Sequence, residues 1–193
     1  MATTTLAGSG TAHDERTATI GMVIFMGSWA MLFASLFFAY GALRVRAPEW
    51  PPSDLPRLPL VLPSLATLAL ALASGVLQRA YAGARIGRPA AGAVAAAALL
   101  GSTFLTLQIV VWRDAYLAGL RPAAGTYPSV FFGLTVFHGL HVVVGLLALA
   151  YLALRSATTA ARPNAALALR LWTLYWHMVG VIWGVMFLLV YVM

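Results

Sequence analysis

Five long apolar stretches follow one another along the chain, and the connections between them hold nearly all of the charged residues. The stretches cover approximately residues 20–43, 58–80, 89–112, 127–154 and 168–192. A helix needs about 20 apolar residues to cross the hydrocarbon layer of a bilayer, and each stretch has that length. The pattern therefore predicts an all-α integral membrane protein, a bundle of five transmembrane helices. They form a single transmembrane domain, residues 20–193, after a polar N-terminal tail, residues 1–19.

The composition supports the same class. Of the 193 residues, 62% are hydrophobic and only 9% are charged, and the mean hydropathy is +0.88. A soluble domain of this length needs far more charge on its surface. The net charge of +7 comes from arginine alone, and its place in the short connections is typical of a topology signal, not of a nucleic-acid-binding patch. The absence of cysteine excludes disulfides, thiolate metal ligands and a thiol nucleophile.

The distribution of arginine predicts the orientation in the membrane. Five helices place the two termini on opposite sides, and seven of the 12 arginines fall on the side of the N-terminus. These seven are Arg16, Arg79, Arg85, Arg88, Arg155, Arg162 and Arg170. Because cytoplasmic segments carry an excess of positive residues, we expect the N-terminus in the cytoplasm and the C-terminus outside.

Two histidines, His138 and His141, lie in the fourth stretch, within a run that has no formal charge from Pro122 to Leu154. Their i,i+3 spacing puts them on one helix face, and polar side chains at that depth normally face protein or water. One hypothesis is haem held between them and His177 of the fifth stretch, because haem iron can take two axial nitrogens at one depth.

The depths of the histidines argue against this hypothesis. Counted from the connection that both helices share, His177 is about 10 Å deep and His141 about 21 Å deep, at a rise of 1.5 Å per residue. A copper or zinc site lacks a carboxylate or thiolate to complete it. All five acidic residues lie outside the apolar stretches, so the intramembrane carboxylate that proton pumps usually need is missing. We therefore expect no cofactor or metal in this chain, and we interpret the histidines as hydrogen-bonded across helices.

Small residues and one amide predict helix–helix contacts. Gly27, Ala30, Ala34 and Gly41 share one face of the first stretch, where they allow a second helix or a partner subunit to come close. Gln108 in the third stretch needs a hydrogen-bond partner on another helix.

The fifth stretch combines a row of aromatic residues with a glycine pair. The aromatic residues share one helix face, which we interpret as a surface for lipid or a partner subunit, and they are Trp172, Trp176, Trp183 and Phe187. Gly180 and Gly184 form a GxxxG pair, which favours ordinary packing inside the bundle.

Several of these segments resemble a known family. Residues 131–142, FFGLTVFHGLHV, resemble the FFxLTGFHGLHV signature of haem–copper oxidase subunit III. Residues 175–183, YWHMVGVIW, resemble that family's YWHFVDVVW in its final helix. Residues 101–112 are similar to its GxxFLxxQxxEW stretch, and residues 21–40 are similar to its first conserved span. The likeness extends over about residues 21–192, and five helices match the short bacterial form of subunit III, which lacks two N-terminal helices.

The resemblance implies a non-redox accessory subunit of a respiratory cytochrome c or quinol oxidase, without catalytic residues of its own. It implies haem and copper in partner subunits, namely the catalytic subunit I together with subunit II, as well as bound phospholipid and a bacterial plasma membrane. The motif residues then serve helix packing and lipid contact. They are Gln108, Trp112, Tyr127, Thr135, His138, His141, Trp176, His177 and Trp183.

The chain departs from the family pattern at three positions where an acid is usual, which here are Trp29, Val111 and Gly180. Losing all three together is expected to leave no polar group stranded, and we interpret the chain as a divergent branch that keeps the scaffold and lipid-contact roles. Two alternatives stay open: a subunit III-like protein associated with nitric oxide reductase, and an independent haem-carrying electron-transfer protein.

Overall fold

A computed structural model describes residues 4–53, 55–56, 58–158 and 165–192, and this part of the chain is helical without any strand. Five helices are long and apolar enough to cross a membrane, as predicted, so this is a multi-pass membrane protein. The helices are α1 (Thr4–Arg46), α2 (Val61–Ala84), α3 (Ala91–Leu117), α4 (Thr126–Thr158) and α5 (Ala165–Phe187). A 3-10 turn (Pro122–Ala124) precedes α4, and a π-helical segment, η2 (Leu188–Val192), continues α5.

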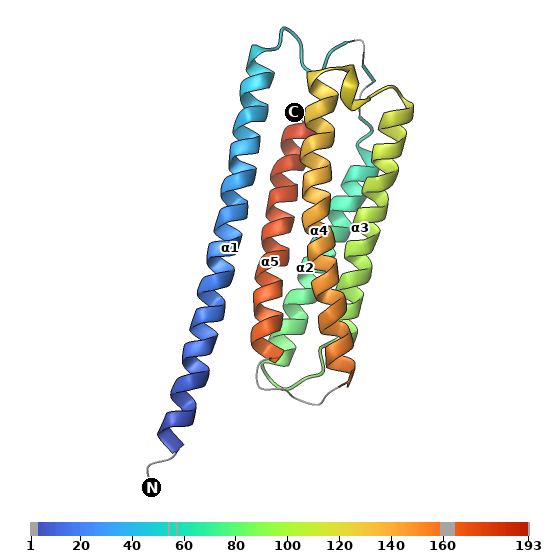
Figure 1. Cartoon of the computed structure of the whole chain (residues 1–193). Helices are drawn as coiled ribbons and strands as arrows, with labels where there is room; N and C mark the ends of the chain where they lie inside the picture. The colour runs from blue at the N-terminus through green and yellow to red at the C-terminus, as the bar shows by residue number, and fades with distance from the viewer. Residues whose placement is uncertain (1–3, 54, 57, 159–164, 193) are drawn as a thin grey trace.

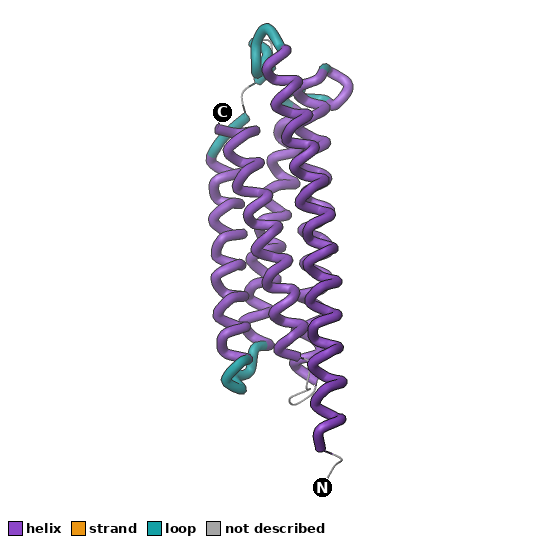
Figure 2. The backbone as a smooth tube through the Cα atoms, turned by 90° about the vertical axis from the view of Figure 1, so that its left-hand side faces the viewer, coloured by secondary structure: helices purple, strands orange, loops and turns teal. Residues whose placement is uncertain are grey.

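Four of the helices form a closed group, and the first stands beside it. Helices α2, α3, α4 and α5 pack in a ring in which α2 contacts α3 and α5, and α4 contacts the same two helices (Figure 1). Helix α1 lies along one side of this group, next to α5 and α4 (Figures 1 and 2). The two termini lie at opposite ends of the molecule, as an odd number of membrane crossings requires (Figure 1).

Helix α1 is longer than its hydropathy predicts. The apolar pattern places its start near residue 20, whereas the helix starts at Thr4 and includes the polar segment before the span. No proline interrupts this segment and alanine, which favours helices, recurs in it, so the backbone can continue as a helix beyond the apolar span. The sequence predicts a separate polar tail over residues 1–19. From Thr4 onward, this segment is part of helix α1.

The core of the four-helix group is built from aromatic rings laid against glycine. Trp176 of α5 lies over Gly101 of α3 and Gly145 of α4, where a Cβ atom would approach the indole ring to 2.5 Å and 2.8 Å. Trp112 lies over Gly139 in the same way, with a corresponding approach of 2.9 Å. Because apolar burial does not drive association between helices in lipid, such close van der Waals contact is what holds them together.

Candidate functional site

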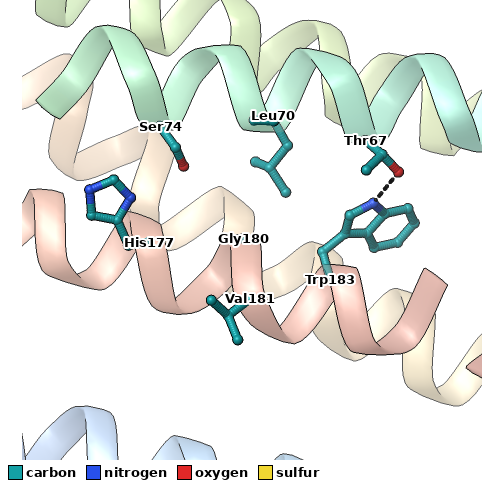
Figure 3. Close-up of a pocket in the computed structure, with 8 residues that line it drawn as sticks. Thr67, Leu70, Ser74, His177, Gly180, Val181 and Trp183 are labelled. Atoms are coloured by element: carbon teal, nitrogen blue, oxygen red, sulfur yellow. Dashed lines mark hydrogen bonds between the residues drawn. The ribbon is translucent and has the colours of Figure 1, made fainter. Parts of the chain in front are cut away.

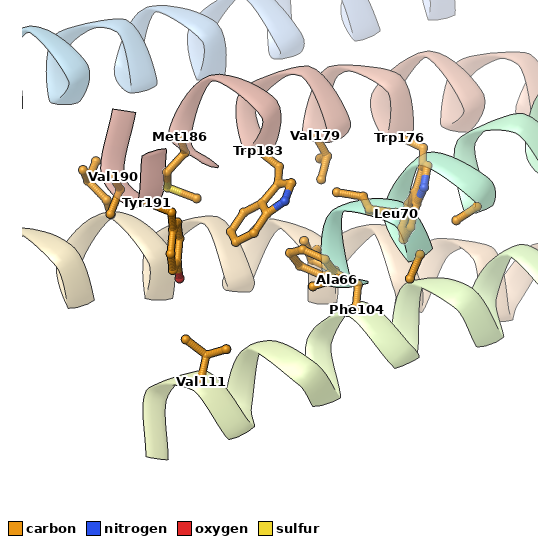
Figure 4. Packing of buried hydrophobic residues seen from close by; sticks show 14 of the residues in the cluster. Ala66, Leu70, Phe104, Val111, Trp176, Val179, Trp183, Met186, Val190 and Tyr191 are labelled. Carbon is orange, nitrogen blue, oxygen red and sulfur yellow. The ribbon is translucent and has the colours of Figure 1, made fainter. Parts of the chain in front are cut away.

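Most of the motif residues lie on the inside of the bundle, and Trp176 is one of them. This side chain is fully buried, with 0% of its surface exposed, and so is Trp183, at 1% (Figure 4). The prediction that the tryptophan face of α5 meets lipid or a partner is therefore wrong for these two residues. A tryptophan can fill the space above a glycine on a neighbouring helix, and the pattern of α5 alone does not show where those glycines lie.

His138 lies at the centre of the bundle with both ring nitrogens unpartnered. Its side chain is 1% exposed and is surrounded by rings from three other helices: Phe33 of α1, Phe104 of α3 and Trp183 of α5, with ring centroids 5.4 to 6.1 Å away. No hydrogen bond reaches either nitrogen. The interpretation of His138 as hydrogen-bonded across helices is wrong, because its imidazole is surrounded by aromatic rings and not by hydrogen-bond donors or acceptors.

His141 bonds within its own helix. Its Nδ1 donates to the carbonyl oxygen of Phe137 at 2.6 Å, and its Nε2 has no partner. The ring of Trp29 from α1 packs edge-on against the imidazole, with centroids 3.8 Å apart. The backbone of the same turn does link helices, because Tyr175 of α5 donates from its hydroxyl to the carbonyl oxygen of His141 at 2.9 Å. The cross-helix bond at this position is therefore made by the main chain.

His177 is the one motif histidine that bonds across helices as expected. Its Nε2 donates to Oε1 of Gln78 on α2 at 3.1 Å. His177 also lines a groove between α2 and α5 whose walls include Ser74, Gly180 and Val181 (Figure 3). His177 thus bonds to α2, while His138 is enclosed by rings of α1, α3 and α5, so the structure does not bring these two imidazoles together as axial ligands.

Three polar motif residues join helices through hydrogen bonds. Gln108 of α3 donates from Nε2 to the Tyr191 hydroxyl at 3.1 Å, which confirms that the amide bonds to another helix, although its Oε1 is unpartnered. Trp112 donates from Nε1 to the Thr135 hydroxyl at 2.9 Å, and that hydroxyl donates in turn to the carbonyl oxygen of Phe131.

Trp183 forms the corresponding link on the other side of the bundle. Its Nε1 donates to the Thr67 hydroxyl of α2 at 2.8 Å (Figure 3). Its ring packs edge-on against Phe104, with ring centroids 4.8 Å apart. The indole nitrogen of Trp176, by contrast, is buried without a partner.

Tyr127 belongs to a second cluster at the other end of the bundle, which sequence reasoning missed. Trp50, which lies in the connection between α1 and α2, packs its ring edge-on against Tyr127 and donates from Nε1 to the hydroxyl of Tyr40 at 3.1 Å. Tyr40 then donates to the carbonyl oxygen of Leu189 at 2.8 Å. The sequence does contain an indication of this cluster. Aromatic residues recur along one face of α1 and end at Tyr40, and they are Phe25, Trp29, Phe33, Phe37 and Tyr40.

The three positions that depart from the family acids lie in different surroundings. Trp29 packs against His141. Val111 of α3 is buried in the core of the bundle, and Gly180 lines the groove beside Ser74. The expectation that these replacements strand no polar group is wrong at Trp29, where the neighbouring Nε2 of His141 has no partner.

The arrangement is suited to packing helices. Within the described ranges no group of three or more histidine, aspartate or glutamate residues is close enough to hold a metal ion. Gln108, Trp112, Thr135, His177 and Trp183 use polar atoms to join one helix to the next. Fold and site together define a multi-pass helical membrane protein whose motif side chains hold the bundle together.

Comparison with known proteins names the family. The whole chain, residues 1–193, matches the family described as cytochrome c oxidase subunit III. It is 34% identical over 179 residues to cytochrome c oxidase subunit 3 of Synechocystis, covering 90% of this chain and 74% of that protein. It is 30% identical over 200 residues to the probable cytochrome c oxidase subunit 3 of Mycobacterium bovis, covering 98% of each. The chicken (Gallus gallus) protein named cytochrome c oxidase subunit 3 is 33% identical over 196 residues, which are 97% of this chain and 74% of that protein. The chain belongs to the cytochrome c oxidase subunit III family.

Proposed function

We propose that this chain is the non-redox accessory subunit III of a bacterial haem–copper oxidase, and that it stabilises the catalytic subunit and binds membrane lipid. The observation that carries the proposal is the use of the motif residues: the tryptophans fill spaces above glycines, and the cross-helix hydrogen bonds come from the same motifs. Family membership supports the same role.

The partners follow from this role. Subunit I and subunit II of the oxidase carry the haem and copper, and this chain contributes packing surface and bound phospholipid. The surface of α1 supports a partner contact, because Gly27, Ala30 and Ala34 are exposed and none of the described helices covers them. The chain spans the plasma membrane with its N-terminus in the cytoplasm and its C-terminus outside.

Purification of the tagged chain from its native membrane in mild detergent tests the proposal. Recovery of a complex with haem a or haem o and copper that consumes oxygen is the expected result. Recovery of the chain without any haem-carrying partner, under conditions in which the complex survives, contradicts it.

The subunit III-like role beside nitric oxide reductase is the second candidate. It is favoured by Trp29, Val111 and Gly180, since a partner that pumps no protons does not need acids at these positions. In the same preparation, haem b with consumption of nitric oxide and no consumption of oxygen identifies that role. Haem bound to the isolated chain identifies the third candidate, an electron-transfer protein, and overturns both others.

The replacement Trp29→Glu tests whether the lost acid matters. The new carboxylate lies beside the unpartnered Nε2 of His141, so we expect it to pair with that histidine and leave proton pumping unchanged. The change Trp29→Gln is the matched control without charge. A strong increase in proton pumping with glutamate alone contradicts a role restricted to scaffold and lipid contact.

A further inference from the structure

The groove between α2 and α5 has no assigned occupant. Thr67, Ala71 and Ser74 of α2 form one wall, and Gly180 and Val181 of α5 form the other (Figure 3). A Cβ atom at Gly180 would meet only the Ser74 hydroxyl, at 3.5 Å, so the groove has free width at this point. Its lining is mostly small and apolar, which suits a flexible apolar ligand.

The groove is about as long as one leaflet of the hydrocarbon core is thick. One end is closed by the hydrogen bond from Trp183 to Thr67, and the other is bordered by the pair of Gln78 and His177. Thr67 and Gln78 are separated by 11 residues, which is about 16 Å along the helix. Half of the hydrocarbon core of a bilayer is about 15 Å. An acyl chain can fill a groove of this length, whereas a transmembrane helix of a partner would need a groove about twice as long.

The end bordered by Gln78 and His177 is polar and leads toward positive charge. Arg85 follows Gln78 by seven residues, and Arg170 precedes His177 by seven residues, so each arginine lies on the same helix face as its partner in the pair. Because α2 and α5 are antiparallel, both arginines lie about 10 Å beyond the pair in the same direction. Both side chains are exposed. The mouth of the groove therefore carries two positive charges at the height of the lipid headgroups.

We propose that this groove binds one anionic phospholipid of the leaflet on the N-terminal side of the protein. The phosphate lies between Arg85 and Arg170, the ester region lies next to Gln78 and His177, and one acyl chain runs along the groove past Gly180. Positive residues at a membrane surface and grooves between helices together select anionic lipids. This inference rests on the proposed function, because lipid binding is part of that function. It adds the place of binding, the groove between α2 and α5, and the anionic class of the headgroup.

Native mass spectrometry of the purified protein with its partner subunits tests the proposal. The probes are phosphatidylglycerol and phosphatidylcholine with identical acyl chains. We expect phosphatidylglycerol to bind more tightly, and we expect Arg85→Ala and Arg170→Ala together to weaken its binding by about 25-fold, at about fivefold for each arginine. Binding of phosphatidylcholine should change little.

Helix α2 provides two control variants, Arg79→Ala and Gly75→Leu. Arg79→Ala removes an arginine from the same side of the membrane, but Arg79 lies about 120° away from Arg85 around α2, so it should have little effect. Gly180→Leu fills the groove and should weaken both lipids, whereas Gly75→Leu adds the same bulk on the exposed face of α2, where no atom lies within 4 Å, and should weaken neither.

Equal binding of the two lipids overturns the proposal, as does an equal effect of Arg79→Ala and the double variant. Occupation by a partner subunit also overturns it. The chain has no cysteine, so Val181→Cys provides a single cross-linking site in the groove, and a cross-link to another subunit is that contrary result. Haem content is measured in the same sample. Selective lipid binding without haem contradicts the proposed function alone, and haem without selective binding contradicts this inference alone.

Discussion

Helix α1 and helix α4 are equally apolar, yet they have opposite surroundings. Of the residues in the most apolar window of each helix, 6% are buried in α1 and 44% in α4. The difference comes from small residues. The glycines of α3 and α4, such as Gly101 and Gly145, lie under the ring of Trp176, while Gly27 and Gly41 of α1 have no atom of another helix within 4 Å. A glycine favours close packing only where a large side chain on a neighbouring helix can fill the space it leaves.

The largest expected effect concerns the ring that fills this space. Trp176→Ala should lower the free energy of unfolding by about 3–5 kcal/mol, because it leaves a cavity between three helices. Trp29→Ala is the matched control on α1, and its loss should be clearly smaller, since Trp29 is only half-buried. Thermal unfolding of both variants in detergent, followed by circular dichroism, gives the comparison. Equal losses contradict the distinction between α1 and the four-helix group.

Replacing glycine by alanine should change the free energy of unfolding in opposite directions in the two regions. Gly101→Ala should destabilise the protein by about 1–3 kcal/mol, because the new methyl group would overlap Trp176 and Leu146. Gly27→Ala should be neutral or stabilise by up to about 1 kcal/mol, since alanine favours the helix and no neighbour opposes it. The same unfolding measurement decides, and a destabilising Gly27→Ala would show that α1 has a close neighbour in the isolated chain.

Two histidines with different surroundings sharpen the comparison, because His138 lies where α1 meets the four-helix group and His177 faces α2. His138→Phe should stabilise the protein by about 1 kcal/mol, because the imidazole has no partner to lose and the ring fits among Phe33, Phe104 and Trp183. His177→Phe should instead destabilise by a similar amount, because it leaves Gln78 without its partner. A clear loss of stability in His138→Phe would show that the imidazole has a bound partner, such as water.

The smallest effect is expected on the exposed face of α1. Ala34→Leu should change the free energy of unfolding of the isolated chain by no more than about 0.5 kcal/mol, as is usual for exposed positions without special contacts. In the assembled complex the same change should weaken association if a partner helix packs there, and co-purification of the partner measures this. Ala96→Leu, on the exposed side of α3, is the matched control.

The sequence predicted the number, type and order of the helices correctly, because each apolar stretch is long enough to span a bilayer and is bounded by charge or proline. It also predicted the family from two motifs around His138 and His177. It did not predict that Trp176 faces inward, because a helix in lipid can bury or expose an aromatic ring with little difference in solvation. Which choice is made depends on Gly101, 75 residues away in the chain.

The hydrogen bonds of the motif residues show the same limit. Gln108 was expected to bond to another helix and does so, since a buried amide must find a partner. His138 and His141 were expected to do the same, yet their rings contact aromatic carbon and the local backbone. Pairing of this kind depends on the rotation of each helix about its axis, and spacing within a single helix does not determine it.

The contacts of α1 have a consequence for the order in which the protein is made. Phe25, Trp29 and Tyr40 contact Tyr175, His141 and Leu189 respectively, all more than 100 residues later in the chain. Since synthesis proceeds from the N-terminus, α1 enters the membrane before α4 and α5 and must wait there until they follow. A helix that waits alone has to be stable in lipid on every side, and the apolar, largely uncovered surface of α1 meets that requirement before any partner exists.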